Sequence, residues 1–198
     1  FNDTRRTPVF CQPIDTLDIT VTGAAIGTEI DSIELFMDEN IQLHTASNDS
    51  LTVQILLQDI PLGMHLITAV TQDTSGLRDS IEFSVMVHNK PVNIQRPNGI
   101  RDGITYNDDN PQSVTLSLFA PYKDYVYVIG DFNNWLVSES YYMHMDSGST
   151  DSSHFWITID DLSQGTEYAF QYLVDGEIRI ADPYTDKILD KWNDNDIA

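Results

Sequence analysis

Short runs of alternating apolar and polar residues, each closed by turn formers, constrain the fold of this chain more than any other feature. In residues 17–21, Leu, Ile and Val alternate with Asp and Thr until Gly23 ends the run. Residues 114–118 repeat the alternation, which is the period-two pattern of a half-buried strand. Such runs recur about every 8–12 residues, and the first half shows no convincing helical period. The chain is therefore predicted to be all-β, in two tandem β-sandwiches.

Breaker residues divide the expected strands into two groups. Residues 89–112 are rich in Pro, Gly, Asn and Asp, and a stretch of this length fits a connector between domains better than an internal loop. We expect Ile100 and Ile104-Thr105-Tyr106 within it to form a short strand that docks on the second domain. The predicted organisation is an N-terminal linker, a first sandwich, a connector, a second sandwich and a lead-in to a further domain, at residues 1–14, 15–88, 89–112, 113–186 and 187–198.

The charge of the chain excludes some classes of partner. Its 198 residues hold 10 Lys and Arg against 31 Asp and Glu, a formal net charge of −21. This charge argues against a nucleic-acid partner and against an anionic membrane surface. No apolar run approaches the roughly 18 residues that a membrane-spanning helix needs, so no membrane insertion is expected.

The residue types also limit cofactors and cross-links. A solvated acidic exterior explains the carboxylates most simply, and calcium held in an acidic loop stays open as the alternative. Otherwise we expect no cofactor and no metal site. The single cysteine, Cys11, excludes an internal disulfide.

Two turn glycines flank the last strands expected for the first sandwich. Leu62-Gly63-Met64-His65 is followed by Ala69-Val70-Thr71-Gln72-Asp73 and by Gly76. This pattern resembles the final hairpin of bacterial immunoglobulin-like modules and implies that fold for residues 15–88. Asp73 is suited to closing an Asx-turn. We expect His65 to be a solvated strand histidine rather than a ligand, because no second His or Cys lies at ligand spacing.

One motif in the second half delivers a tryptophan onto a loop. The strand-like run 125–129 stops at Gly130-Asp131-Phe132-Asn133-Asn134, which is rich in turn formers, and Trp135 follows. Burial of a Trp removes roughly 150–250 Å² from water, so an exposed Trp135 would need a reason. A bound sugar, a partner domain and packing under its own loop all stay open.

Three pieces of the second half occur in the order and spacing of a known family. They are Val126–Trp135, the pattern Leu162-x-x-Gly165-x-x-Tyr168-x-Phe170-x-Tyr172-x-Val174-Asp175-Gly176, and Ala181-Asp182-Pro183-Tyr184. Together they resemble the early-set immunoglobulin-like domain called the family 48 carbohydrate-binding module. That domain precedes the catalytic barrel in many enzymes of glycoside hydrolase family 13. The resemblance implies an early-set fold for residues 113–186.

The end of the chain extends this resemblance. Residues 182–194 are similar to the lead-in to the catalytic domain in amylase-like proteins of gut-type Bacteroidetes. The resemblance implies a downstream catalytic barrel in the same polypeptide and export, to the cell surface or the periplasm.

The resemblance also names candidate carbohydrate-binding residues. Family members that bind α-glucans stack the sugar on a loop tryptophan, whose position Trp135 takes here. Asn134 lies next to it, and Gln171 stands where the family has a lysine. The chain departs from the pattern after the Asp-Gly turn, where Ile178 replaces a second aromatic residue. Gln171 is able to hydrogen-bond a sugar hydroxyl, but Ile178 offers no flat face.

Other aromatic residues are candidates for packing against a neighbouring domain. Trp156 alternates with Phe155 and Ile157, so we expect it on the outer face of its sheet, beside Tyr127. Trp192 lies in a polar tail and has little near it to pack on. We therefore predict that Tyr127, Trp156 and Trp192 contact the downstream domain.

No catalytic residue is expected in the chain itself. A family 13 enzyme needs a barrel of about 250 residues, with two carboxylates about 5–5.5 Å apart in the retaining geometry. Two sandwiches leave no length for such a barrel, and the family's catalytic motifs do not occur.

Three functions stay open. The first is a non-catalytic accessory region of an α-amylase-like hydrolase, which acts as a spacer and brace with or without weak α-glucan binding. The second is a stand-alone glycan-binding surface protein, and the third is a structural or adhesion array of immunoglobulin-like modules. The motifs around Trp135 and Asp182 favour the first.

Overall fold

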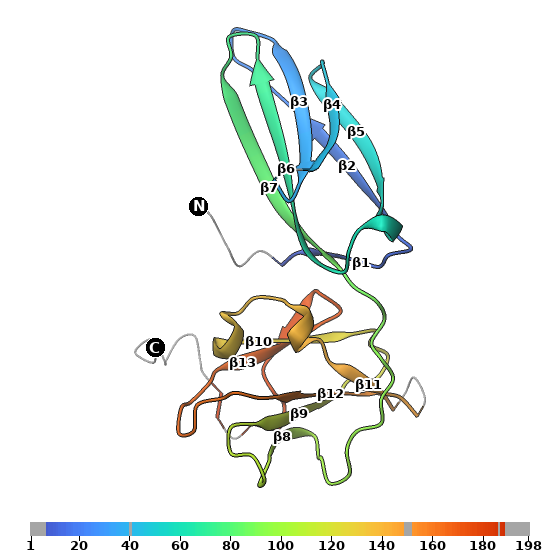
Figure 1. Ribbon diagram of the computed structural model, residues 1–198, viewed down its shortest axis with the longest axis vertical. Helices are drawn as coiled ribbons and strands as arrows, with labels where there is room; N and C mark the ends of the chain where they lie inside the picture. Colours follow the sequence, from blue (N-terminus) through green and yellow to red (C-terminus); the bar gives the residue numbers. More distant parts are fainter. Residues whose placement is uncertain (1–6, 40, 149–151, 186, 189–198) are drawn as a thin grey trace. The chain divides into compact units, whose positions relative to one another are not determined.

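The computed structural model describes residues 7–39, 41–148, 152–185 and 187–188 (Figure 1). These residues form β-strands joined by turns and by the single-turn 3-10 helices η1 (Leu57–Asp59), η2 (Asp131–Asn133) and η3 (Glu139–Tyr141). The prediction of an all-β fold is confirmed. None of the helices in the described ranges has the length and apolar character needed to cross a membrane. The chain divides into two compact units, Phe1–Asn89 and Lys90–Ala198.

The first unit contains two sheets. Its strands are β1 (Val9–Cys11), β2 (Thr16–Thr22), β3 (Ile30–Met37), β4 (Ile41–Ala46), β5 (Ser50–Leu56), β6 (Gly63–Asp73) and β7 (Arg78–Val87). The larger sheet has the order β1-β7-β6-β3-β4, and β2 pairs with β5 in the smaller one. Ile33, Leu35 and Ile67 of the larger sheet and Leu51 of the smaller one belong to a single buried core. Two sheets around one core are consistent with the expected sandwich.

The predicted linker at residues 1–14 is corrected at its C-terminal end. Val9–Cys11 form β1, which pairs in parallel with β7, and Cys11 belongs to the first core at 7 % exposure. A three-residue strand is too short to show alternation, so no pattern in the sequence indicates it. Asp73 behaves as predicted, because its Oδ1 accepts hydrogen bonds from Ser75 N and Leu77 N.

His65 is buried rather than solvated, contrary to the expectation from the sequence. It is 7 % exposed, its Nδ1 lies 2.8 Å from Asp38 Oδ2, and its Nε2 lies 2.8 Å from the carbonyl oxygen of Pro61. Both ring nitrogens of His65 thus lie within hydrogen-bonding distance of an oxygen atom. Asp38 Oδ1 also accepts from Leu66 N, so the pair ties the end of β3 to β6. Sequence spacing does not reveal a turn carboxylate 27 residues away.

The second unit also contains two sheets. Its strands are β8 (Gly103–Tyr106), β9 (Val114–Phe119), β10 (Val126–Gly130), β11 (His144–Asp146), β12 (His154–Ile159), β13 (Phe170–Val174) and β14 (Ile178–Ile180). The three-stranded sheet has the order β10-β13-β14, and the four-stranded sheet has the order β11-β12-β9-β8. All of these strand pairs are antiparallel.

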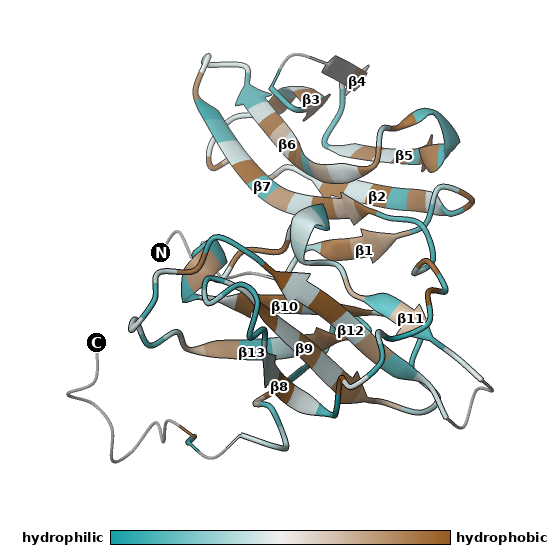
Figure 2. Cartoon of the chain, turned by 60° about the horizontal axis from the view of Figure 1, so that its bottom comes forward, coloured by the Kyte–Doolittle hydropathy of each residue, from teal (hydrophilic) through white to brown (hydrophobic). Residues whose placement is uncertain are grey.

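One face of each sheet in the second unit builds its core. Val128 and Tyr172 of the three-stranded sheet pack in one cluster with Leu118 and Phe155 of the four-stranded sheet. Figure 2 shows the resulting alternation of hydrophobic and hydrophilic segments along the strands. The Asp-Gly turn between β13 and β14 has positive φ at both residues, 50° and 71°, as its sequence predicts.

Much of the predicted connector at residues 89–112 belongs to the second unit, so this boundary is corrected. β8 is the docked strand expected within it. Upstream, Ile94 N donates to the carbonyl oxygen of Met145 at 2.8 Å, and Met145 N donates to that of Val92 at 3.0 Å. Residues 92–102, which we name the strap, are therefore bonded to the edge of the four-stranded sheet. The Pro, Gly, Asn and Asp residues of this stretch indicated a linker without contacts. The bonds to Met145 could not be predicted, because they leave no periodic pattern in the sequence.

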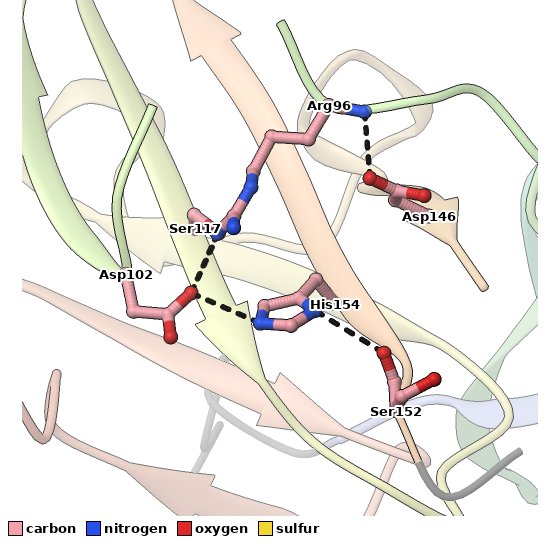
Figure 3. A network of polar contacts seen from close by, with 6 residues as sticks. All are labelled: Arg96, Asp102, Ser117, Asp146, Ser152 and His154. Atoms are coloured by element: carbon pink, nitrogen blue, oxygen red, sulfur yellow. Dashed lines mark hydrogen bonds and ion pairs between the residues drawn. The ribbon is translucent and has the colours of Figure 1, made fainter. Parts of the chain in front are cut away.

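A polar network holds the strap further along (Figure 3). Arg96 Nη1 donates to Asp102 Oδ1 at 2.6 Å and to Ser117 Oγ on β9 at 2.8 Å. His154 Nε2 lies 3.4 Å from the same Asp102 oxygen, and Arg96 N donates to Asp146 Oδ2 at 2.8 Å. The Nη1 atom and the backbone N of Arg96 are thus both bonded inside the second unit.

Candidate functional site

The loop that carries Trp135 is held in shape by its own side chains. Asn133 Oδ1 accepts from Gly130 N at 2.8 Å, and Asn133 Nδ2 donates to the carbonyl oxygen of Val128 at 2.9 Å. Trp135 N donates to the carbonyl oxygen of Gly130 at 2.9 Å and closes the turn. Asn134 and Trp135 both have left-handed φ, 54° and 61°. Such positions cost of order 1–3 kcal/mol each for non-glycine residues, so the Asn133 bonds stabilise a strained loop.

Gly130 is required at the end of β10 by space rather than by its torsion angles. Its φ of −177° is extended backbone that any residue adopts. A Cβ there would lie 2.5 Å from the carbonyl oxygen of Ala169 and 2.8 Å from Phe170 Cβ. The close approach of these two chain segments brings the start of β13 next to the loop.

Trp135 is partly exposed and fixed at its polar edge. Its Nε1 donates to Asp131 Oδ1 at 2.9 Å. Asp131 Oδ2 accepts from Ala169 N at 2.7 Å, and Asp131 N donates to the carbonyl oxygen of Ala169 at 3.0 Å. Trp135 is not a member of the buried core of the second unit. It is therefore a supported surface side chain and not a core anchor.

The structure brings two of the other candidate residues to the same end of the sheet as Trp135. Asn134 is exposed in the loop, and the partly exposed Gln171 pairs with Ile129, the residue before Gly130. Ile178 pairs with Val174 at the opposite end of β13 and is 43 % exposed. The position where the family has a second aromatic residue is thus changed, and it lies at the other end of β13 from Gln171.

Trp156 packs inside its own unit, and its predicted contact with a downstream domain stays a prediction. It lies on the outer face of the four-stranded sheet, as the alternation predicted, but Tyr127 is on the other sheet. Trp156 Nε1 donates to the carbonyl oxygen of Ile94 in the strap at 2.9 Å. The ring centroids of Trp156 and His144 lie 5.0 Å apart. The strap covers this face, so Trp156 is only 9 % exposed.

The other two residues predicted to pack between domains have different outcomes. Tyr127 is fully buried, and its ring stacks on Tyr142 with the centroids 4.5 Å apart. Its predicted contact with another domain stays a prediction. Trp192 lies outside the described residues.

An aromatic group that the sequence analysis did not single out surrounds the base of the loop. The Phe132 ring stacks on Tyr141 with centroids 5.1 Å apart, and the Tyr168 ring lies 6.4 Å from Phe132. Tyr168 Oη accepts from Ser163 N at 3.0 Å. In the sequence, Tyr168 and Phe170 flank Ala169, which is bonded to Asp131. This aromatic pair was the sequence signal for the group.

The Ala181–Tyr184 motif has a structural role. Asp182 is 2 % exposed, and its Oδ1 accepts from Tyr184 N at 2.9 Å. Burial raises the pKa of the Asp182 carboxyl, and the nearby Asp102 adds to this. Gly103 at the start of β8 has a φ of 88°, and a Cβ there would lie 2.7 Å from Tyr184 Cβ. The motif therefore closes the chain against β8.

The described ranges contain no group of three or more His, Cys, Asp and Glu side chains arranged to hold a metal ion. The arrangement around Trp135 offers instead a fixed aromatic face with amide side chains near it. Such a surface is suited to a neutral ligand with a flat apolar face and hydroxyl groups at its edge.

Comparison with known proteins agrees with this geometry for the second unit. Residues 103–185 match the family model of Carbohydrate-binding module 48 (Isoamylase N-terminal domain). The match begins at β8 and includes the Trp135 loop, Gln171 and the Ala181–Tyr184 motif. No curated protein matches the sequence.

Solved structures give weaker similarities. A pullulanase from Anoxybacillus sp. LM18-11 complexed with maltotriose is 14 % identical with a TM-score of 0.32, over 89 % of this chain and 25 % of that chain. The GBS pullulanase SAP in complex with maltotetraose is 13 % identical with a TM-score of 0.30, over 89 % and 23 %. Dimeric latent PorU from Porphyromonas gingivalis is 16 % identical with a TM-score of 0.28, over 88 % and 18 %. The chain thus spans a quarter or less of the length of these proteins.

Proposed function

We propose that the chain is a non-catalytic accessory region of an enzyme that acts on α-glucans, and that its second unit binds α-glucan weakly through Trp135. The observation that carries this proposal is the indole of Trp135, partly exposed and bonded to Asp131 at 2.9 Å, on a loop inside the carbohydrate-binding module match. A ring held this way has one orientation before any ligand arrives.

Stacking on Trp135 supplies the main part of the proposed affinity. Covering about 60–100 Å² of the ring with the apolar face of a glucose unit stabilises the complex by about 1.5–2.5 kcal/mol. Asn134 is exposed beside the ring, and Gln171 lies at the same end of the sheet. Their amides donate and accept hydrogen bonds at sugar hydroxyls.

Weak rather than tight binding follows from the departure at Ile178. That side chain lies opposite Val174, away from the register position of Gln171, and has no aromatic face. A single stacking position leaves most of a glucan chain uncontacted, so the lost translational and side-chain freedom offsets much of the gain.

The wider role belongs to the same proposal. The first unit, an immunoglobulin-like sandwich, acts as a spacer and brace, and a catalytic barrel of glycoside hydrolase family 13 follows in the same polypeptide. The similarity of residues 182–194 to the lead-in of such barrels supports this arrangement. Export to the cell surface or periplasm is proposed on the same resemblance, and calcium in an acidic loop is proposed only on the abundance of carboxylates.

Affinity electrophoresis on gels with and without amylopectin tests the binding function. The wild-type chain should be retarded by amylopectin, and Trp135→Ala should migrate as it does in the plain gel. Tyr106→Ala is the matched control, because Tyr106 is an aromatic residue of the same unit and 75 % exposed. It should be retarded like the wild type. Equal migration of the wild type in both gels would remove glucan binding and favour a structural array.

A further inference from the structure

We infer that Asp131 is the positioning residue of this site, the group that sets the Trp135 ring in the orientation in which it receives a sugar. The inference rests on the proposed function. Its two carboxylate oxygens have separate partners: Oδ1 accepts from Trp135 Nε1 at 2.9 Å, and Oδ2 accepts from Ala169 N at 2.7 Å. The side chain therefore bridges the indole to the start of β13.

Asp131 is itself held by two hydrogen bonds to Ala169, which make it a rigid support. Its backbone N donates to the carbonyl oxygen of Ala169 at 3.0 Å, and its carboxylate accepts from the N of the same residue. The loop cannot move away from β13 without losing both bonds. The two carboxyl oxygens suit this place because both side-chain partners, Trp135 Nε1 and Ala169 N, are N–H donors.

The hydrogen bonds that hold the main chain of the turn do not hold the ring. Asn133 bonds to Gly130 N and to the carbonyl oxygen of Val128, and neither bond involves the indole. The hydrogen bond at Nε1 is thus the contact that selects the side-chain orientation of a partly exposed Trp. Fixing one such side chain in advance improves affinity by about two- to tenfold, because binding then orders less.

The same bond restricts how Trp135 contacts a ligand. The only hydrogen-bond donor of the indole is used by Asp131, so the side chain offers a sugar its face and no hydrogen bond. Asn134 and Gln171 then form the hydrogen bonds to the sugar hydroxyls. Asp131 itself is a positioning residue, since its two oxygens are directed at protein donors.

Two substitutions at Asp131 in the full chain test the inference, with Glu139→Gln as the control for loss of a carboxylate in the same loop. Affinity for maltoheptaose is measured by titration calorimetry, and the Trp135 indole N–H resonance by NMR, after assignment with Trp135→Phe. Asp131→Ala should shift the resonance and weaken binding about two- to tenfold. Glu139→Gln should change neither.

Asp131→Asn separates positioning from stability. It retains an oxygen that accepts from Nε1 and places an amide N–H₂ against Ala169 N, so the folded state loses stability while the ring keeps its support. Affinity and the indole resonance should both return toward wild-type values. Affinity unchanged in Asp131→Ala, or recovered resonance without recovered affinity in Asp131→Asn, would overturn the inference and leave glucan binding intact. A wild-type chain that gives no binding heat would overturn the proposed function and this inference with it.

Discussion

Replacement of Gly130 by alanine should destabilise the second unit through one steric contact. The added Cβ would meet the carbonyl oxygen of Ala169 at 2.5 Å and Phe170 Cβ at 2.8 Å. The carbonyl cannot yield freely, because it accepts from Asp131 N at 3.0 Å. Overpacking of this kind costs about 1–3 kcal/mol. With an m-value of about 2 kcal/mol/M, the urea midpoint should fall by about 0.5–1.5 M.

Tryptophan fluorescence reports this unit selectively, since all 3 Trp residues of the chain lie after residue 89. Gly148→Ala is the matched control. Gly148 is exposed, and among the described residues a Cβ there would meet Ser152 Oγ at an ordinary 3.5 Å. The free energy of unfolding of Gly148→Ala should stay within about 0.5 kcal/mol of the wild-type value. A Gly130→Ala midpoint equally close to the wild type would refute the claim that space, and not torsion angle, requires glycine here.

Three further predictions concern the polar groups Asp182, Tyr172 and Asp38. Burial raises the pKa of Asp182, so the stability that its protonated carboxyl contributes is complete below the ordinary pKa and is lost as the pH rises through the raised pKa. Asp182→Asn lacks this loss and should therefore become more stable relative to the wild type as the pH rises. Urea titrations followed by fluorescence measure the difference, and a difference that does not change with pH contradicts the prediction. Tyr172→Phe should be as stable as the wild type or more so, because the buried Tyr172 hydroxyl has no hydrogen-bond partner among the described residues; a loss above about 1 kcal/mol contradicts it. Burial raises the pKa of Asp38, but its hydrogen bonds to His65 and Leu66 N outweigh this and lower the pKa. Because the side chain is 42 % exposed and therefore screened by solvent, Asp38→Asn should lower the stability of the first unit by only about 0.5–1 kcal/mol at neutral pH. That cost should vanish as the pH falls through the lowered pKa, and labelling of the buried Cys11 thiol in denaturant measures it.

The sequence predicted those parts of the fold that depend on local pattern. The alternation in 17–21 and 114–118 marked β2 and β9, and Asp175-Gly176 marked a hairpin whose two φ values are positive. Asp73 closed the expected turn. In each case the deciding interactions lie within a few residues or repeat with period two, so the residues themselves carry the information.

The parts that could not be predicted depend on contacts between distant residues. The strap has no period, and its attachment rests on Ile94 meeting Met145 and Trp156. His65 has a strand-like context that gives no sign of Asp38. The sequence shows that a buried Trp156 needs an acceptor for its indole N–H. It does not show that the acceptor is the carbonyl oxygen of Ile94, because only the fold brings the two residues together.

The candidate site was partly visible in the same way. Trp135 was identifiable as a loop aromatic, and its family resemblance indicated a sugar platform. The role of Asp131 was not identified, because its second partner, Ala169 N, is 38 residues away. The replacement at Ile178 was readable from the motif, whereas its distance in register from Gln171 required the strand pairing.

Titration calorimetry of the wild-type chain and Trp135→Ala with maltoheptaose tests the central claim most directly, namely that the second unit binds α-glucan on the face of Trp135. The account predicts saturable heat for the wild type and, from a loss of about 1.5–2.5 kcal/mol of stacking, an affinity about 10–60-fold lower in the variant. Equal affinity of the two proteins, or no binding heat from either, would contradict it.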